Sequence, residues 1–129
     1  MADGNQTIVL TSDTQSSINA SPIMDVWEKV ITATFDADDT TDVSITIPTN
    51  GRLTHVTLKV PNTTNAITTQ LKINDNGDNT IFDTGEVAEN ASYNYSLSED
   101  LSGNIDVVIG VSGAVGATGS IIVATLRGR

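Results

Sequence analysis

Two runs of alternating apolar and polar residues flank a turn in residues 52–75, and this pattern constrains the fold more than any other feature. Within each run the apolar residues occupy alternate positions: Val56, Leu58 and Val60 in the first run, and Ile67, Leu71 and Ile73 in the second. Such alternation is typical of β-strands that are buried on one face. The link at residues 61–65 has turn chemistry and no apolar residue. We therefore expect the two runs to form a central antiparallel pair.

Similar patterns predict strands over most of the remaining chain. The further runs are residues 24–35, 43–47, 80–82, 91–97, 105–111 and 120–126, with a short apolar patch at 8–10. Turn residues separate them, including Pro48–Gly51, Asn74–Asp78 and Ser102–Gly103. About eight strands with regular turns indicate an all-β fold, an antiparallel β-sandwich or jelly-roll-like domain. The pattern leaves an up-and-down barrel as the alternative.

The 129 residues suffice for one domain with a single core. Residues 1–22 are polar apart from the patch at 8–10, and residues 23–129 contain the strand pattern. We therefore expect a single β-sandwich domain over 23–129, preceded by an N-terminal arm over 1–22. A frayed terminus and an arm that becomes ordered against a partner are both open interpretations of that segment.

The net charge of −10 argues against nucleic acid as a partner, because an acidic surface repels phosphates. The first residues lack the basic and apolar regions of a secretory signal, and no apolar run approaches the roughly 18 residues of a membrane span. The chain has no cysteine, which excludes disulfides, thiolate metal sites and a cysteine nucleophile.

The residues that could support catalysis are few, and no catalytic residue is predicted. His55 is the single histidine and lies on the polar parity of its strand, as expected for a solvated side chain. No nucleophile-elbow spacing occurs. The five aromatic residues mostly share parity with the aliphatic core, so a sugar-binding aromatic platform is not indicated. We expect a protein that is not an enzyme and uses no cofactor.

The turn at residues 74–79 offers clustered carboxylate and amide oxygens, which a calcium ion prefers. Asp75 and Asp78 are weak calcium candidates there, but the spacing does not fit a calcium-binding loop. Asp and Asn also cap hairpin turns for backbone reasons alone. No metal is expected. The glycine-rich segment 112–119 lacks the features of a phosphate-binding loop and is expected to let strands or subunits approach closely.

Several segments together resemble the small β-sandwich virion proteins of tailed bacteriophages, especially head decoration (cement) proteins. They are SPIMDVW, GRLTHVTLKVP, LKINDNGDNTIFDTGE and GAVGATGSIIVATLRGR, and they span residues 21–129. The resemblance implies a structural protein on the outer surface of a capsid, made in the host cytoplasm. It would bind the major capsid protein, as a homotrimer at three-fold sites, and cement neighbouring subunits.

For such a role the candidate partner contacts are Thr7, Ile8, Val9 and Leu10 of the arm, together with Trp27. The alternative for Trp27 is a place in the core. Two other functions stay open: a tail, neck or fibre component of a phage, and a receptor- or glycan-binding β-sandwich module. A small hydrolase would require an acid–base pair, and the sequence does not suggest one.

Overall fold

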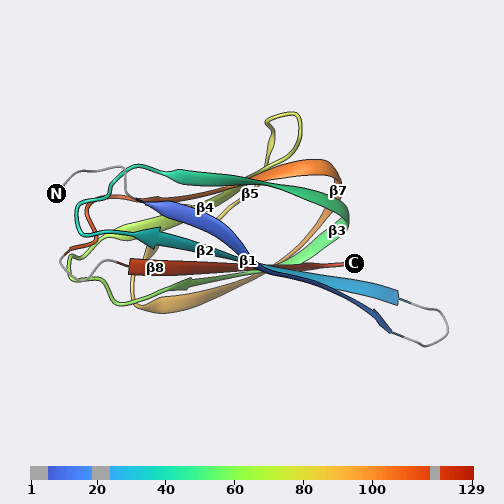
Figure 1. Ribbon diagram of the computed structural model, residues 1–129, viewed down its shortest axis with the longest axis horizontal. Helices are drawn as coiled ribbons and strands as arrows, with labels where there is room; N and C mark the ends of the chain where they lie inside the picture. The colour runs from blue at the N-terminus through green and yellow to red at the C-terminus, as the bar shows by residue number, and fades with distance from the viewer. Residues whose placement is uncertain (1–5, 19–23, 117–119) are drawn as a thin grey trace.

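The computed structural model describes residues 6–18, 24–116 and 120–129, which fold into antiparallel β-strands (Figure 1). The strands are β1 (Thr7–Ile18), β2 (Met24–Phe35), β3 (Val43–Val60), β4 (Thr68–Asn74), β5 (Thr80–Asp83), β6 (Val87–Ala88), β7 (Ala91–Val111) and β8 (Ser120–Gly128). The predicted all-β sandwich with about eight strands is confirmed. Within the described ranges, no helix is long and apolar enough to cross a membrane.

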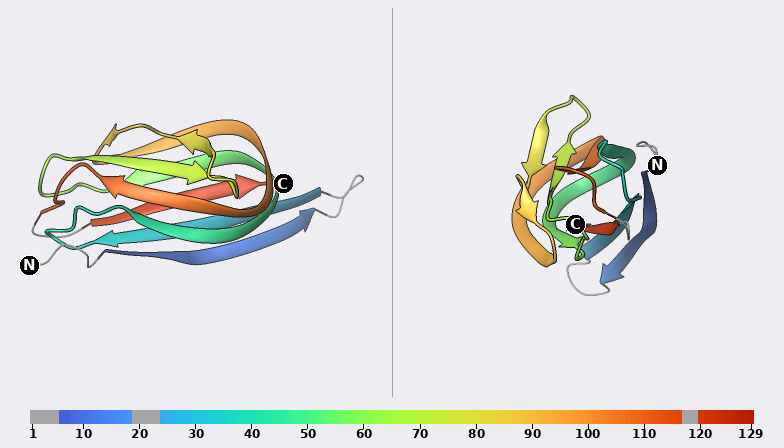
Figure 2. Two further views of the ribbon diagram at one scale, coloured as in Figure 1. Left: turned by 90° about the horizontal axis from the view of Figure 1, so that it is seen from above. Right: turned by 90° about the vertical axis from the view of Figure 1, so that its left-hand side faces the viewer.

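The strands form one hydrogen-bonded path in the order β1-β2-β8-β3-β7-β4-β5, with β6 paired to β4. This path folds over into two layers because β3 and β7 are long enough to belong to both (Figure 2). The first layer joins β1, β2 and β8 to the second half of β3 and the first half of β7. The second layer joins the first half of β3 and the second half of β7 to β4, β5 and β6.

The sheet bends from one layer into the other at the two segments that the sequence predicted as separate turns. Residues 48–51 and 102–103 do not end their strands, so the predicted pairs of strands 43–47/52–60 and 91–97/105–111 are each a single strand. The two segments face each other in the ladder, with Thr49 opposite Gly103 and Gly51 opposite Leu101. Both glycines have positive φ angles, 95° and 89°, which a glycine adopts without steric cost. The turn residues therefore bend two paired strands together.

The predicted central pair is wrong. Strand β3 pairs with β7 and β8, whereas β4 pairs with β5, β6 and β7. The two runs belong to opposite layers, and their apolar residues point into the same core: Val56, Leu58, Leu71 and Ile73 are each fully buried. Alternation identifies the buried face of a strand but not its hydrogen-bonded neighbour, and residues 61–67 cross from one layer to the other.

The core consists of the apolar parities that the sequence predicted. It includes Ile31, Ala33 and Phe35 of β2, Ile105, Val107 and Ile109 of β7, and Ile122, Ala124 and Leu126 of β8, all at most 2% exposed. Tyr93 and Tyr95 pack against this cluster, and the ring of Tyr95 meets that of Phe82 edge to face at 5.2 Å. Burial of these side chains is the main stabilising contribution.

Residues 7–18, which lie in the range expected to form an arm, make up β1, an edge strand that pairs with β2 along its whole length. A bulge interrupts the ladder between Leu10 and Ser12. Near its start, Gln6 Nε2 donates to the carbonyl of Thr41 at 2.8 Å, beside the beginning of β3. The far end of the hairpin extends past β8, because β8 pairs with β2 only from Trp27 onwards (Figure 1).

Candidate functional site

An uncharged outer face covers the first layer beside the β1 edge. Cross-strand partners lie on the same side of a sheet, and the ladders align Thr7 with Thr34 and Ile121, and Val9 with Thr32 and Val123. Val30, Thr125 and Thr57 form the next row. We call these nine side chains the threonine–valine face: Thr7, Val9, Val30, Thr32, Thr34, Thr57, Ile121, Val123 and Thr125.

This face contains two exposed large apolar side chains. Val9 is 49% exposed and Ile121 is 56% exposed, on either side of β2. The nearest charges on the same side of this layer border the face: Lys59 is exposed and directly opposite Val123, and Arg127 Nε pairs with Glu28 Oε2 at 2.7 Å. Because protein interfaces are depleted in charge at their centres, this composition suits contact with another protein.

The second layer has a different surface, which carries several carboxylates. Asp106 accepts from Thr46 Oγ1 at 2.6 Å, and Asp83 accepts from Gln70 Nε2 at 2.7 Å. The bond from Gln70, the backbone N–H of Gly85 and the charge of Lys72 hold the pKa of Asp83 below its ordinary value. The two outer surfaces of the sandwich therefore differ in charge.

The arm candidates divide between the two sides of β1. Thr7 and Val9 are exposed on the threonine–valine face, whereas Ile8 and Leu10 are half-buried and pack against the core. Trp27 is only 8% exposed and belongs to the core cluster, which matches the alternative given for it. Val30, Thr32 and Thr57 alternate with core residues of their own strands, but only the strand order assembles them into one face.

The calcium candidates form a capped turn. Asp75 Oδ1 accepts the backbone N–H groups of Gly77 and Asn79 at 2.8 and 2.9 Å. These bonds, that from Asn79 first, hold the pKa of Asp75 below its ordinary value of 3.8. Asp78 has a positive φ of 62° in the same turn. The described residues contain no group of three or more His, Cys, Asp or Glu side chains placed to hold a metal ion.

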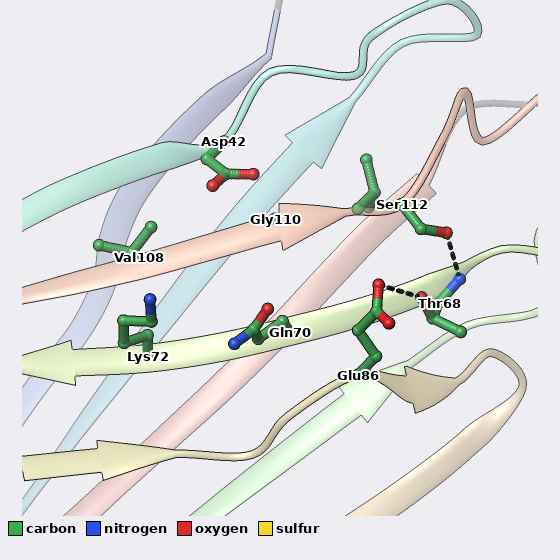
Figure 3. A pocket seen from close by; sticks show the side chains of 9 residues that line it. Asp42, Thr68, Gln70, Lys72, Glu86, Val108, Gly110 and Ser112 are labelled. Carbon is green, nitrogen blue, oxygen red and sulfur yellow. Dashed lines mark hydrogen bonds between the residues drawn. The ribbon is translucent and has the colours of Figure 1, made fainter. Parts of the chain in front are cut away.

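A small polar cavity of about 90 Å³ opens on the second layer, between β4 and β7 (Figure 3). Gln70, Lys72, Thr68 and Glu86 border it, and Thr68 Oγ1 lies 3.3 Å from Glu86 Oε1. The backbone N–H of Thr68 donates to Ser112 Oγ at 2.8 Å. Amide, ammonium, hydroxyl and carboxylate groups thus converge on one space, and none of the described residues that line it is aromatic.

The remaining sequence features are His55 and the glycine-rich segment. His55 is exposed, as predicted. In the glycine-rich segment, Gly116 allows a close approach, because a Cβ there would lie 2.5 Å from Cβ of Thr64. Residues 117–119 of that segment lie outside the described residues.

No family model and no curated protein matches this chain. Solved structures with a similar fold include a subunit of Bacillus endospore appendages, disulfide-linked pili, at 18% identity and a TM-score of 0.47 over 99% of this chain and 93% of that one. The carbohydrate-binding module TmCBM61, solved with β-1,4-galactotriose, is 12% identical with a TM-score of 0.42, covering 97% and 88%. A bacteriophage CBA120 tailspike domain is 16% identical with a TM-score of 0.34, covering 96% and 19%. Similarities this distant carry no information about function.

Proposed function

We propose that this protein is a non-enzymatic structural component of a tailed-phage virion that decorates the capsid exterior and cements its subunits. The threonine–valine face carries the proposal: an uncharged surface with exposed Val9 and Ile121 in a chain of net charge −10. The sequence resemblance to head decoration proteins points to the same role.

The distribution of charge supports a contact through the threonine–valine face. Copies of a chain with 16 acidic and six basic residues repel one another and repel packaged DNA. Such a chain can contact the major capsid protein at the lowest electrostatic cost through the uncharged threonine–valine face. The carboxylates of the second layer would then face solvent. In this proposal the protein is synthesised in the host cytoplasm and binds as trimers at three-fold sites on the shell.

The β1 edge is the second element of the proposed contact. Within the described residues β1 has a strand neighbour on one side only, and Asp13 is its single charged residue. Exposed edges of this kind accept a further strand from a partner. The two-stranded end of the β1–β2 hairpin extends beyond β8, and such a ribbon has little stability of its own. Contact with a capsid subunit would support it.

Co-sedimentation with heads that lack this protein tests the proposal. The wild-type chain should bind saturably at a fixed ratio to the major capsid protein. Val9→Lys and Ile121→Lys should each weaken binding at least about tenfold, because they place a charge within a buried contact. Ser44→Lys adds the same charge to an exposed position of the second layer and is the matched control.

The outcomes separate the parts of the proposal. Absence of wild-type binding would refute the capsid role and favour a tail, neck or fibre position. Binding that is unaffected by both face variants would keep the capsid role and reject the threonine–valine face as the contact.

Glycan binding is the second candidate function, favoured by the polar cavity between β4 and β7. Its amide, hydroxyl and carboxylate groups match the hydrogen-bonding chemistry of sugars. A glycan array with the wild-type chain, followed by Gln70→Ala on any ligand found, tests this function. Binding that survives Gln70→Ala would place the sugar elsewhere.

A further inference from the structure

A larger cavity, of about 460 Å³, lies at the end of the first layer where β1, β2, β3 and β8 meet. It adjoins the threonine–valine face, because Arg127 and His55 lie two residues from Thr125 and Thr57 on the same side of the sheet, and it is separate from the polar cavity of the second layer. His55 is directly opposite Arg127 in the ladder, and Arg127 is directly opposite Glu28. These three side chains therefore lie on one side of the sheet, and Arg129 also lines the cavity.

The cavity concentrates positive charge in an acidic protein. Two of the six Lys and Arg residues and the single histidine line it, in a chain with 16 acidic residues. Among the described residues of the lining, Glu28 is the acidic one, and it accepts from Nε of Arg127. That contact involves Nε, and the guanidinium group of Arg127 has four further N–H donors on its two terminal nitrogens. The side chains of Arg127, Arg129 and Glu28, taken together, sum to one positive charge, which suits a monoanion.

A buried donor below the cavity provides an independent observation. Trp27 lines the cavity and is 8% exposed, and its Nε1–H has no hydrogen-bond partner among the described residues. Buried donors in folded proteins normally have an acceptor, so this N–H can donate to a water molecule or a ligand. Gly128 is directly opposite Trp27 in the ladder, and its missing Cβ leaves room for the ring.

We propose that this cavity binds a carboxylate group, with the guanidinium groups of Arg127 and Arg129 as its principal donors. Arginine presents paired N–H groups that match the two oxygens of a carboxylate, and such charge-assisted bonds are stronger than neutral ones. The carboxylate can come from an acidic peptide or from an acidic sugar such as a uronic acid. This inference does not depend on the capsid role.

Trp27 is the only tryptophan of the chain, so its fluorescence reports on the cavity directly. The full chain is titrated in parallel with acetate, glucuronate and a short glutamate peptide, at constant ionic strength maintained with sodium chloride. We expect a saturable change of tryptophan emission and a shift of the indole N–H resonance. Glucose, which lacks the carboxylate, should cause neither change.

Arg129→Gln keeps the contact between Arg127 and Glu28, and Arg127→Gln removes it, so the two variants test the donors separately. Each should weaken binding about tenfold, the usual effect of removing a charged partner from a carboxylate. Lys72→Gln removes one positive charge from the second layer and should leave the affinity unchanged. A glutamate peptide that binds tighter than glucuronate identifies a protein partner, and the reverse order identifies a sugar.

Two results would overturn the proposal: no saturable change with any of the three carboxylates, or equal binding by wild type and both arginine variants. Far-ultraviolet circular dichroism of each variant confirms that the sheet is retained. A lost signal then reflects the cavity and not the fold.

Discussion

The indole ring of Trp27 packs directly against Gly128 on the adjacent strand. The two residues are opposite each other in the β2–β8 ladder, and a Cβ on Gly128 would lie 2.3 Å from Cζ2 of the ring and 2.1 Å from the carbonyl oxygen of Arg52. Gly51 makes a similar allowance, since a Cβ there would lie 2.0 Å from the carbonyl oxygen of Arg129. Both glycines let the end of β8 fit between β2 and the bend of β3.

Gly128→Ala is therefore expected to destabilise the fold strongly. The added methyl group must displace a backbone carbonyl and a buried ring, so we expect a loss of about 2–4 kcal/mol in the free energy of unfolding. Denaturation monitored by tryptophan fluorescence measures this loss. Gly113→Ala is the control, because its Cβ would meet only Cγ2 of Ile67 at an ordinary 3.7 Å. Equal stability of the two variants would contradict the packing described here.

The ion pair between Lys29 and Asp13 joins β1 to β2 and gives a second prediction. Lys29 Nζ lies 2.8 Å from Asp13 Oδ1, with side chains 11% and 48% exposed, and 5.8 Å from the centroid of the Trp27 ring. Asp13→Ala leaves a buried ammonium without its carboxylate and should cost about 1–2 kcal/mol, reduced by the half-exposure of Asp13. Urea denaturation measures the change.

Lys29→Met separates charge from packing at this site. Methionine fills a similar volume without a charge, so we expect a change within about 1 kcal/mol of wild type. Once Lys29 is methionine, Asp13→Ala should have little further effect. A full additional loss in the double variant would show that Asp13 stabilises β1 by another route.

The buried faces of the strands could be predicted from sequence because burial imposes a period of two on each strand separately. Val56 and Leu58, or Ile105 and Val107, show their orientation without knowledge of any neighbour. Pairing between strands has no such local signal. Residues 56–60 and 67–73 have compatible patterns and a good turn between them, yet they belong to opposite layers.

Bends in paired strands and surfaces shared by several strands depend on the register between strands. They could not be predicted from the sequence, because register has no local signal. Gly51 and Gly103 have the chemistry of turns, and only their positions opposite Leu101 and Thr49 show that they bend continuous strands. The threonine–valine face joins residues more than 100 positions apart, such as Val9 and Val123. Of the predicted contacts, Thr7 and Val9 lie on this face because their parity is opposite to that of Ile8 and Leu10.

Two carboxylates, those of Asp75 and Asp83, are expected to contribute to the loss of stability at acidic pH. The pKa values of Asp75 and Asp83 are both lowered in the fold, so each favours the folded state when ionised. Their contribution is complete above the unfolded value of 3.8 and is lost as the pH falls through the lower folded values. Thermal melting from about pH 6 to about pH 2 should show a weaker pH dependence in the double variant Asp75→Asn, Asp83→Asn. An unchanged slope would show that other carboxylates dominate acid unfolding.

The turn at residues 74–79 is expected to be independent of calcium. Oδ1 of Asp75 is already occupied by two backbone N–H groups, and Nδ2 of Asn79 lies 3.5 Å from Oδ2. A cation would have to displace donors that already satisfy the carboxylate. We therefore expect the same melting temperature with excess calcium and with EDTA, and the same result for Asp78→Asn.

Asp75→Ala should lower the melting temperature equally in both conditions, whereas Asp75→Asn, which keeps an acceptor oxygen, should lower it less. A calcium-dependent rise in melting temperature that disappears in both Asp75→Asn and Asp78→Asn would instead establish a calcium site in this turn.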